Sequence, residues 1–134
     1  MKLPNNYIRG ILNSAHLCDG FLTTEIFLFS ESKNCIGYDE TSINWCDDDN
    51  VQEFSLQQKK DTGEPLFGYG VAVLDTDALN TCIKQFKNYL GHERRALDGN
   101  PYHGNILLIH GVKPQIKRLI LNQLLMKGKP ISRE

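Results

Sequence analysis

The stretch FGYGVAVLDTDALNTCIKQFKNYLG, residues 67–91, carries the clearest structural pattern in the chain. Its first part, residues 67–74, is rich in β-branched and aromatic residues and predicts a strand. Asp75, Thr76 and Asp77 then supply side chains that can cap a helix. After them, apolar residues recur at the spacing of one helical face. These residues are Leu79, Cys82, Ile83, Phe86 and Leu90. A strand that leads into an amphipathic helix predicts a domain with both α and β structure.

The chain beyond this unit predicts a further strand and a last helix. Gly91 is the expected stop of the first helix, and a polar loop over 91–104 follows it. The apolar run NILLIH, residues 105–110, predicts a buried strand. Pro114 suits the first turn of the final helix. We expect the strands on either side of the first helix to be parallel neighbours, joined by a right-handed crossover.

The first half of the chain has weaker patterns. Residues 7–17 place apolar side chains on one helical face, although Gly10 weakens a helix there. Residues 21–30 and 41–46 favour strands, and residues 47–58 favour a helix that opens on acidic residues. The sequence therefore predicts one α+β domain over residues 1–134. Its small mixed sheet would have about four strands, packed by about three or four helices that lie mostly on one face.

Composition and charge narrow the classes of function. Hydrophobic residues make up 40% and charged residues 23% of the 134 residues, as in a globular domain that forms its own core. The formal net charge is -1, whereas nucleic-acid binders usually carry a basic excess, so we do not expect a nucleic-acid partner. No apolar run approaches the ~20 residues of a membrane span, and the N-terminus does not resemble an export signal. We expect a cytoplasmic protein without a membrane partner.

The cysteines do not predict a disulfide or a metal site. Four cysteines occur, and a reducing compartment keeps such thiols free. Cys82 lies on the predicted helical face and is expected in the core. His16 and Cys18 are two residues apart, but the paired ligand spacings that are typical of zinc sites are absent. We therefore expect no metal and no cofactor.

The triplet Asp47, Asp48 and Asp49 allows three interpretations. Carboxylates at a helix start cap free amides and interact well with the helix dipole. Carboxylates also ligate hard cations, although the alternating pattern of a calcium loop is missing. A third interpretation is an acidic patch that attracts a basic partner protein, with Trp45 as an aromatic anchor. The solvated helix start comes first of the three and the protein interface second.

His103 is the best single catalytic candidate. It lies where the polar loop meets the strand 105–110, and histidine titrates near neutral pH. Arg94 and Arg95 lie in the same loop and could hold an anion. The sequence nevertheless offers no second base or nucleophile to pair with one histidine. A loop histidine that bonds a backbone carbonyl is therefore the interpretation that we prefer.

Two hypotheses about function follow. The first is a non-enzymatic module that binds another protein, as an immunity protein, antitoxin or inhibitor does; this rests on size and on the lack of a catalytic constellation. The alternative is a small hydrolase or phosphodiesterase that acts on a phosphate-containing or RNA substrate through His103. The final helix is apolar over much of its circumference, so a homodimer through it is a further hypothesis. The first hypothesis leads.

Overall fold

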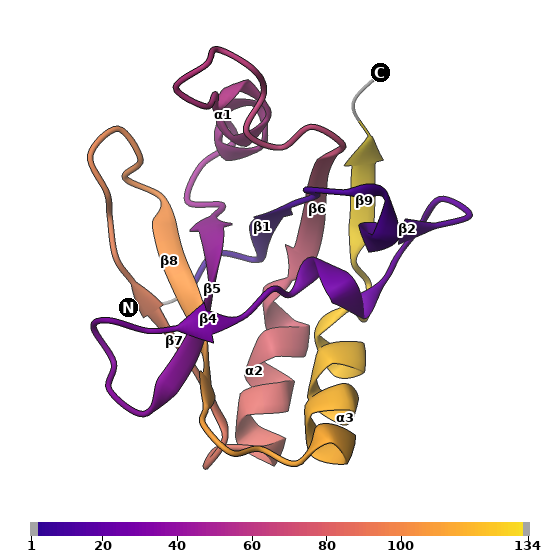
Figure 1. Ribbon diagram of the computed structural model, residues 1–134, viewed down its shortest axis with the longest axis vertical. Helices are drawn as coiled ribbons and strands as arrows, with labels where there is room; N and C mark the ends of the chain where they lie inside the picture. The colour runs from indigo at the N-terminus through magenta and orange to yellow at the C-terminus, as the bar shows by residue number, and fades with distance from the viewer. Residues whose placement is uncertain (1–2, 133–134) are drawn as a thin grey trace.

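The computed structural model describes residues 3–132, and its centre is one seven-stranded sheet (Figure 1). Six strands follow the spatial order β7-β8-β5-β1-β6-β9, and β4 pairs with β5 outside this path. The strands are β1 (Asn6–Gly10), β4 (Ser30–Glu31), β5 (Tyr38–Trp45), β6 (Gly70–Asp75), β7 (Leu90–Arg94), β8 (His103–Ile109) and β9 (Lys129–Ser132). A separate pair is formed by β2 (Leu17–Cys18) and β3 (Phe21–Leu22). Each strand pairing within residues 3–132 is antiparallel.

Three α-helices and two short 3-10 helices complete the described chain. They are α1 (Val51–Gln57), α2 (Thr76–Gln85), α3 (Pro114–Leu124), η1 (Ser14–His16) and η2 (Thr24–Ile26). Figure 1 shows α2 and α3 side by side, away from α1. Leu79 of α2 and Ile120 and Leu124 of α3 are fully buried in the larger hydrophobic core. Pro114 opens α3 because its fixed φ suits the first turn and its missing N–H is not needed there.

The central strand β1 has a hydrophobic core on each side. Tyr7 belongs to the larger core, which the α2–α3 pair covers, whereas Ile8 packs with Val51 of α1 and Val71 of β6 in a smaller one. Because side chains alternate along a strand, these two cores lie on opposite faces of the sheet. The helices therefore cover both faces, and the single helix α1 shields the second face only in part. Within residues 3–132, no helix has the length and apolar character that a bilayer crossing requires.

The α+β class is confirmed, but the expected sheet was too small. Seven strands replace the predicted four, and the sheet is antiparallel where a mixed sheet was expected. The strands on either side of α2 are not parallel neighbours, because β5 and β1 lie between β6 and β8. The predicted loop 91–104 contains most of β7, and β9 was not anticipated.

The helix predicted over residues 7–17 is wrong. Residues Asn6–Gly10 form β1, a central strand whose two faces are both buried. A strand of this kind is apolar on both sides and so lacks the alternation that distinguishes a strand from a helix. Residues 21–30 are likewise not one strand, since β3, η2 and β4 share them. Within α3, Leu121 is 9% exposed, so part of the broad apolar face of this helix packs inside the domain.

Candidate functional site

The strands β1 and β5 separate after a short stretch of pairing. Tyr7 and Ile8 are the residues of β1 that pair with β5, and β4 pairs with a more distant part of β5. Between these two stretches, the backbone carbonyl of Ser42 accepts a hydrogen bond from Nη1 of Arg9 at 2.9 Å. Arg9 thus bridges the two strands at the point where they no longer pair.

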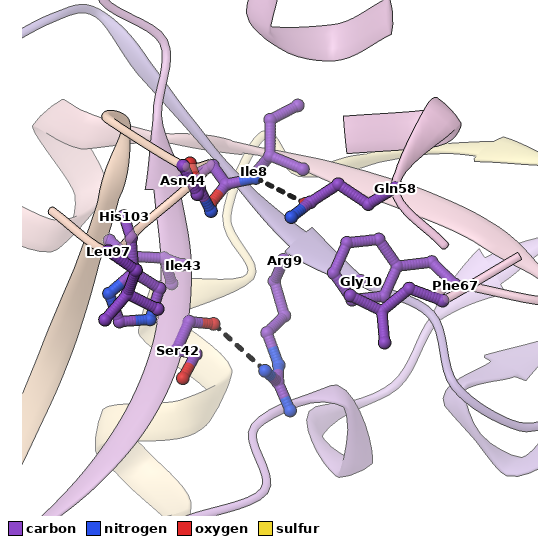
Figure 2. A pocket seen from close by; sticks show the side chains of 12 residues that line it. Ile8, Arg9, Gly10, Ser42, Ile43, Asn44, Gln58, Phe67, Leu97 and His103 are labelled. Atoms are coloured by element: carbon purple, nitrogen blue, oxygen red, sulfur yellow. Dashed lines mark hydrogen bonds between the residues drawn. The ribbon is translucent and has the colours of Figure 1, made fainter. Parts of the chain in front are cut away.

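A pocket of about 220 Å³ lies at this separation and is called the β1–β5 pocket here. Figure 2 shows the Arg9 side chain between Ser42 on one side and Gly10 and Phe67 on the other. The pocket is lined by Ile8, Arg9, Gly10, Ser42, Ile43, Asn44, Gln58, Leu66, Phe67, Leu97, Asn100 and His103. Its walls therefore combine apolar side chains with a few polar groups, which is the usual composition of a small-molecule site.

Arg9 is a buried cation without a carboxylate partner. It is 7% exposed, and its Nε donates to the backbone carbonyl of Ile26 at 2.8 Å. The ion pairs within residues 3–132 join other groups: Arg94 to Asp47, Arg95 to Glu93, and His110 to Asp39. Burial lowers the pKa of Arg9 to about 10, because the charged form loses its hydration.

The amide side chains of the pocket are bonded to one another. Nδ2 of Asn44 donates to Oγ of Ser55 at 2.9 Å and to Oε1 of Gln58 at 3.1 Å. Nδ2 of Asn100 donates to Oδ1 of Asn44 at 2.9 Å, and Oδ1 of Asn100 accepts from the backbone N–H of Tyr102 at 3.1 Å. A network with its members satisfied fixes side-chain positions, so this wall of the pocket is pre-organised.

His103 lines the same pocket and has a defined tautomer. Its Nδ1 lies 2.7 Å from the backbone carbonyl oxygen of Arg95. A carbonyl only accepts, so Nδ1 carries the proton and Nε2 is an acceptor when the ring is neutral. No hydrogen bond in the described chain joins this ring to a carboxylate or a hydroxyl. The structure thus places His103 in a pocket, and it also shows the carbonyl bond that the sequence analysis preferred.

Arg94 and Arg95, the predicted anion holders, lie outside the β1–β5 pocket and bind carboxylates of this chain. Nη1 of Arg94 donates to Oδ2 of Asp47 at 2.8 Å, and a second bond makes the pair bidentate. The Arg94 guanidinium also lies 5.7 Å from the centre of the Trp45 ring. Nε and Nη2 of Arg95 both donate to Glu93 at 3.0 Å. The predicted grouping of His103 with these arginines around one anion is therefore not formed.

Glu93 is the most strongly perturbed carboxylate of the described chain. Hydrogen bonds from Arg95 and Asn105 hold its pKa at about 2, although burial opposes this shift. Nδ2 of Asn105 donates to Oε1 of Glu93 at 2.9 Å, and the thiol of Cys35 lies 3.5 Å from Oε2. The hydrogen bonds and the arginine both favour the charged form, so Glu93 is a fixed anion and not a base near neutral pH.

The acidic triplet lies where β5 leads into α1. Asp47 is paired with Arg94, and Oδ1 of Asp48 accepts from the backbone N–H of Asn50 at 2.8 Å. The N-cap of α1 is Asn50, so the predicted acidic cap is displaced into the preceding turn. The triplet borders an open polar groove of about 550 Å³. Trp45 is fully buried, so its ring is not at this surface and is not available as the predicted aromatic anchor for a partner.

The cysteine and histidine side chains of residues 3–132 form neither a disulfide nor a metal-ligand cluster. The four cysteines are unpaired, and Cys82 is buried in the larger core as predicted. Within residues 3–132, no group of three or more histidine, cysteine, aspartate or glutamate side chains is arranged to hold a metal ion. His16 is also buried; its Nδ1 accepts from the backbone N–H of Leu12 at 3.2 Å.

Comparisons with known proteins add no assignment: no protein-family model, no curated protein and no solved structure matches this chain. Sequence reasoning identified His103 but missed Arg9, Asn44, Gln58 and Asn100. Arg9 had no signal in the sequence, because a charged residue is ordinary on the outer face of the amphipathic helix that was predicted over residues 7–17.

Proposed function

We propose that this chain is a non-enzymatic binding module whose ligand site is the β1–β5 pocket. One observation carries the proposal: polar side chains from separate segments converge on one small hollow with apolar walls. They are Arg9 of β1, Asn44 of β5, Gln58 after α1, Asn100 of the β7–β8 connection and His103 of β8. Few polar groups at fixed positions among apolar walls are what orients a bound ligand.

The arrangement favours binding over catalysis. General acid–base or nucleophilic chemistry needs a proton donor or acceptor that is oriented by a second group. Among the described residues that line the pocket, His103 carries an imidazole, but its Nδ1 is held by a backbone carbonyl. The amide side chains bond to each other, which fixes the shape of the pocket without activating a nucleophile.

A fragment screen by NMR on the ¹⁵N-labelled full chain tests this proposal. Fragments that bind should shift backbone amides around the pocket, above all those of Gly10 and His103. Asn100→Ala should weaken binding about tenfold or more, because it releases Asn44 and the Tyr102 amide together. Asn34→Ala, at an exposed loop position, is the matched control. Shifts confined to other surfaces would reject the pocket as the ligand site.

A second candidate is recognition of a basic partner protein by the acidic segment. Asp48 and Asp49 are exposed beside the open groove, and carboxylates on a surface orient a positively charged partner. Titration with the product of a neighbouring gene tests it. Asp48→Asn with Asp49→Asn should weaken binding, whereas Asp61→Asn, in an exposed turn, should not. Unchanged affinity in the double variant would remove this surface from consideration.

The enzymatic alternative keeps His103 and replaces the predicted arginines by Arg9. These two residues share the β1–β5 pocket, so a phosphate-containing substrate could meet a cation and an imidazole together. The test is turnover of small phosphodiesters and short RNA by the full chain. His103→Ala should abolish any turnover found, and a variant that keeps it would discard this assignment.

A further inference from the structure

We infer that the β1–β5 pocket takes the carboxylate group of a small, largely apolar organic acid, and that Arg9 binds this group. The inference rests on the proposed function and names the ligand class of the same site.

The charge of Arg9 has no counter-charge in the described chain. A guanidinium has five N–H donors; in Arg9, Nε donates to the carbonyl of Ile26 and Nη1 donates to the carbonyl of Ser42. Carbonyl dipoles replace part of the lost hydration, but they do not neutralise the charge. Burial of an ion without an opposite charge is costly, and proteins normally pair such ions. Arg94 and Arg95, which are far more exposed, both have carboxylate partners.

The surroundings of Arg9 favour one negative charge over two. Among residues 3–132, no lysine and no other arginine lines the pocket. The Nδ1 of His103 donates to the backbone carbonyl of Arg95, so in the neutral ring Nε2 offers a lone pair and no proton to the ligand. A phosphate monoester would bring about -1.5 to -2 charges near neutral pH, which one guanidinium leaves partly unbalanced. A carboxylate brings one charge and matches the planar fork of a guanidinium.

The walls define the rest of the ligand. Ile8, Leu66, Phe67 and Leu97 give the pocket an apolar side. Its volume of about 220 Å³ lies below the roughly 300–1,000 Å³ of sites for drug-sized ligands. A cavity of about 150 Å³ is enough for benzene. The pocket therefore suits an acid of the size of benzoate, with its ring against the apolar side and its carboxylate at Arg9.

An NMR titration of the wild-type chain with benzoate, with benzamide and with inorganic phosphate tests the inference. Benzamide has the shape of benzoate without its charge. Benzoate should shift the Arg9 Nε–H resonance together with the amides of Gly10 and Ser42. Benzamide should bind at least about tenfold more weakly. Arg9→Gln should abolish benzoate binding, and Arg118→Gln, at an exposed position of α3, should leave it unchanged.

The outcomes separate the inference from the proposed function. Equal binding of benzamide and benzoate at the pocket would overturn the carboxylate inference and leave the pocket as a ligand site. Tighter binding of phosphate than of benzoate at Arg9 would overturn the choice of carboxylate over phosphate. No shift at Arg9 with any of the three probes would overturn the inference, while the fragment screen judges the pocket itself. The NMR titrations of the wild-type chain distinguish these outcomes even if the Arg9→Gln variant fails to fold.

Discussion

Arg9 and the pair Arg94 and Arg95 lie in or beside the same sheet, yet their surroundings differ. The side chains of Arg94 and Arg95 are 37% and 40% exposed, and each makes a bidentate contact with a carboxylate. Arg9 is 7% exposed and has two backbone carbonyls as partners. The cations with the easier access to water are thus the ones that have counter-ions.

We call Arg94, Arg95 and their carboxylate partners Asp47 and Glu93 the paired region. Folding alone accounts for this region, but it does not explain why Arg9 is buried without a counter-ion. Exposed ion pairs contribute little, about 0 to 1 kcal/mol each, and they are common on protein surfaces. A buried charge opposes folding unless its surroundings compensate for the lost hydration. A feature that opposes folding is more informative about function than one that costs nothing. The unpaired charge of Arg9 therefore points to the β1–β5 pocket as the ligand site, whereas Arg94 and Arg95 are already neutralised by carboxylates of the chain.

The largest expected effect tests how rigidly the paired region is built. Gly104 of β8 lies opposite Arg94, and a Cβ there would collide with the Trp45 indole and the backbone oxygen of Glu93. Neither neighbour moves easily, so Gly104→Ala should cost about 3 kcal/mol or more of unfolding free energy in urea denaturation. Gly91→Ala on the adjacent strand meets no atom and is the control. A cost below about 1 kcal/mol would show that this region is loosely packed.

The next effect concerns the pocket. A Cβ at Gly10 would collide with the ring of Phe67, and both residues line the β1–β5 pocket. Gly10→Ala should cost about 1 to 3 kcal/mol of stability, because the ring must shift, and it should also abolish benzoate binding. Gly68→Ala meets no atom and should change stability by no more than about 0.5 kcal/mol. Benzoate affinity that survives in folded Gly10→Ala would place the ligand elsewhere.

The sequence predicted the elements whose pattern is local. The helices α2 and α3 have apolar residues at helical spacing, and their buried faces follow from it, although α2 ends at Gln85 and not at the predicted stop, Gly91. The strand β1 was misread because both of its faces are covered. The short strands β7 and β9 form because β8 and β6 offer them partners, and such pairing has no signal within residues 90–94 or 129–132. The antiparallel order of the sheet is likewise set by contacts between distant segments.

The site was predictable only in part for the same reason. His103 was found because it stands where a polar loop meets an apolar strand. The partners of Arg94 and Arg95 could not be predicted from the sequence. Asp47 is 47 residues away from Arg94, and Glu93 and Arg95 lie two residues apart at the end of β7, a segment that was predicted as a loop. The pocket itself exists because β1 and β5 separate, and strand separation is a property of the assembled sheet.

A smaller effect uses the pH dependence of the paired region. Contacts with Arg95 and Asn105 lower the pKa of Glu93 from 4.5 to about 2. A lowered carboxylate pKa stabilises the fold at pH values above the unfolded pKa, and this contribution is lost as the pH falls from 4.5 towards 2. Because Arg95 is 40% exposed and water screens the pair, we expect a loss of about 1 to 2 kcal/mol. Urea denaturation at several pH values measures it.

Glu93→Gln serves as the comparison for this profile. The amide cannot titrate, so the variant should lose less stability than the wild type between pH 4.5 and pH 2. Equal losses in both proteins would assign the acid sensitivity to other carboxylates. Arg9 keeps its charge throughout this range, so the β1–β5 pocket should not contribute to the difference.

The smallest expected effect is at the exposed pair of Arg94 and Asp47. A double-mutant cycle with Arg94→Ala and Asp47→Ala should give a coupling of about 0.2 to 1 kcal/mol, because both side chains remain in contact with water. The coupling should shrink further at high salt, where exposed charges are screened. Arg94 also lies over the Trp45 ring, a contact that does not require Asp47. A coupling well above 1 kcal/mol that persists at high salt would show that this pair is as shielded from water as Arg9, and the contrast between the two regions would then fail.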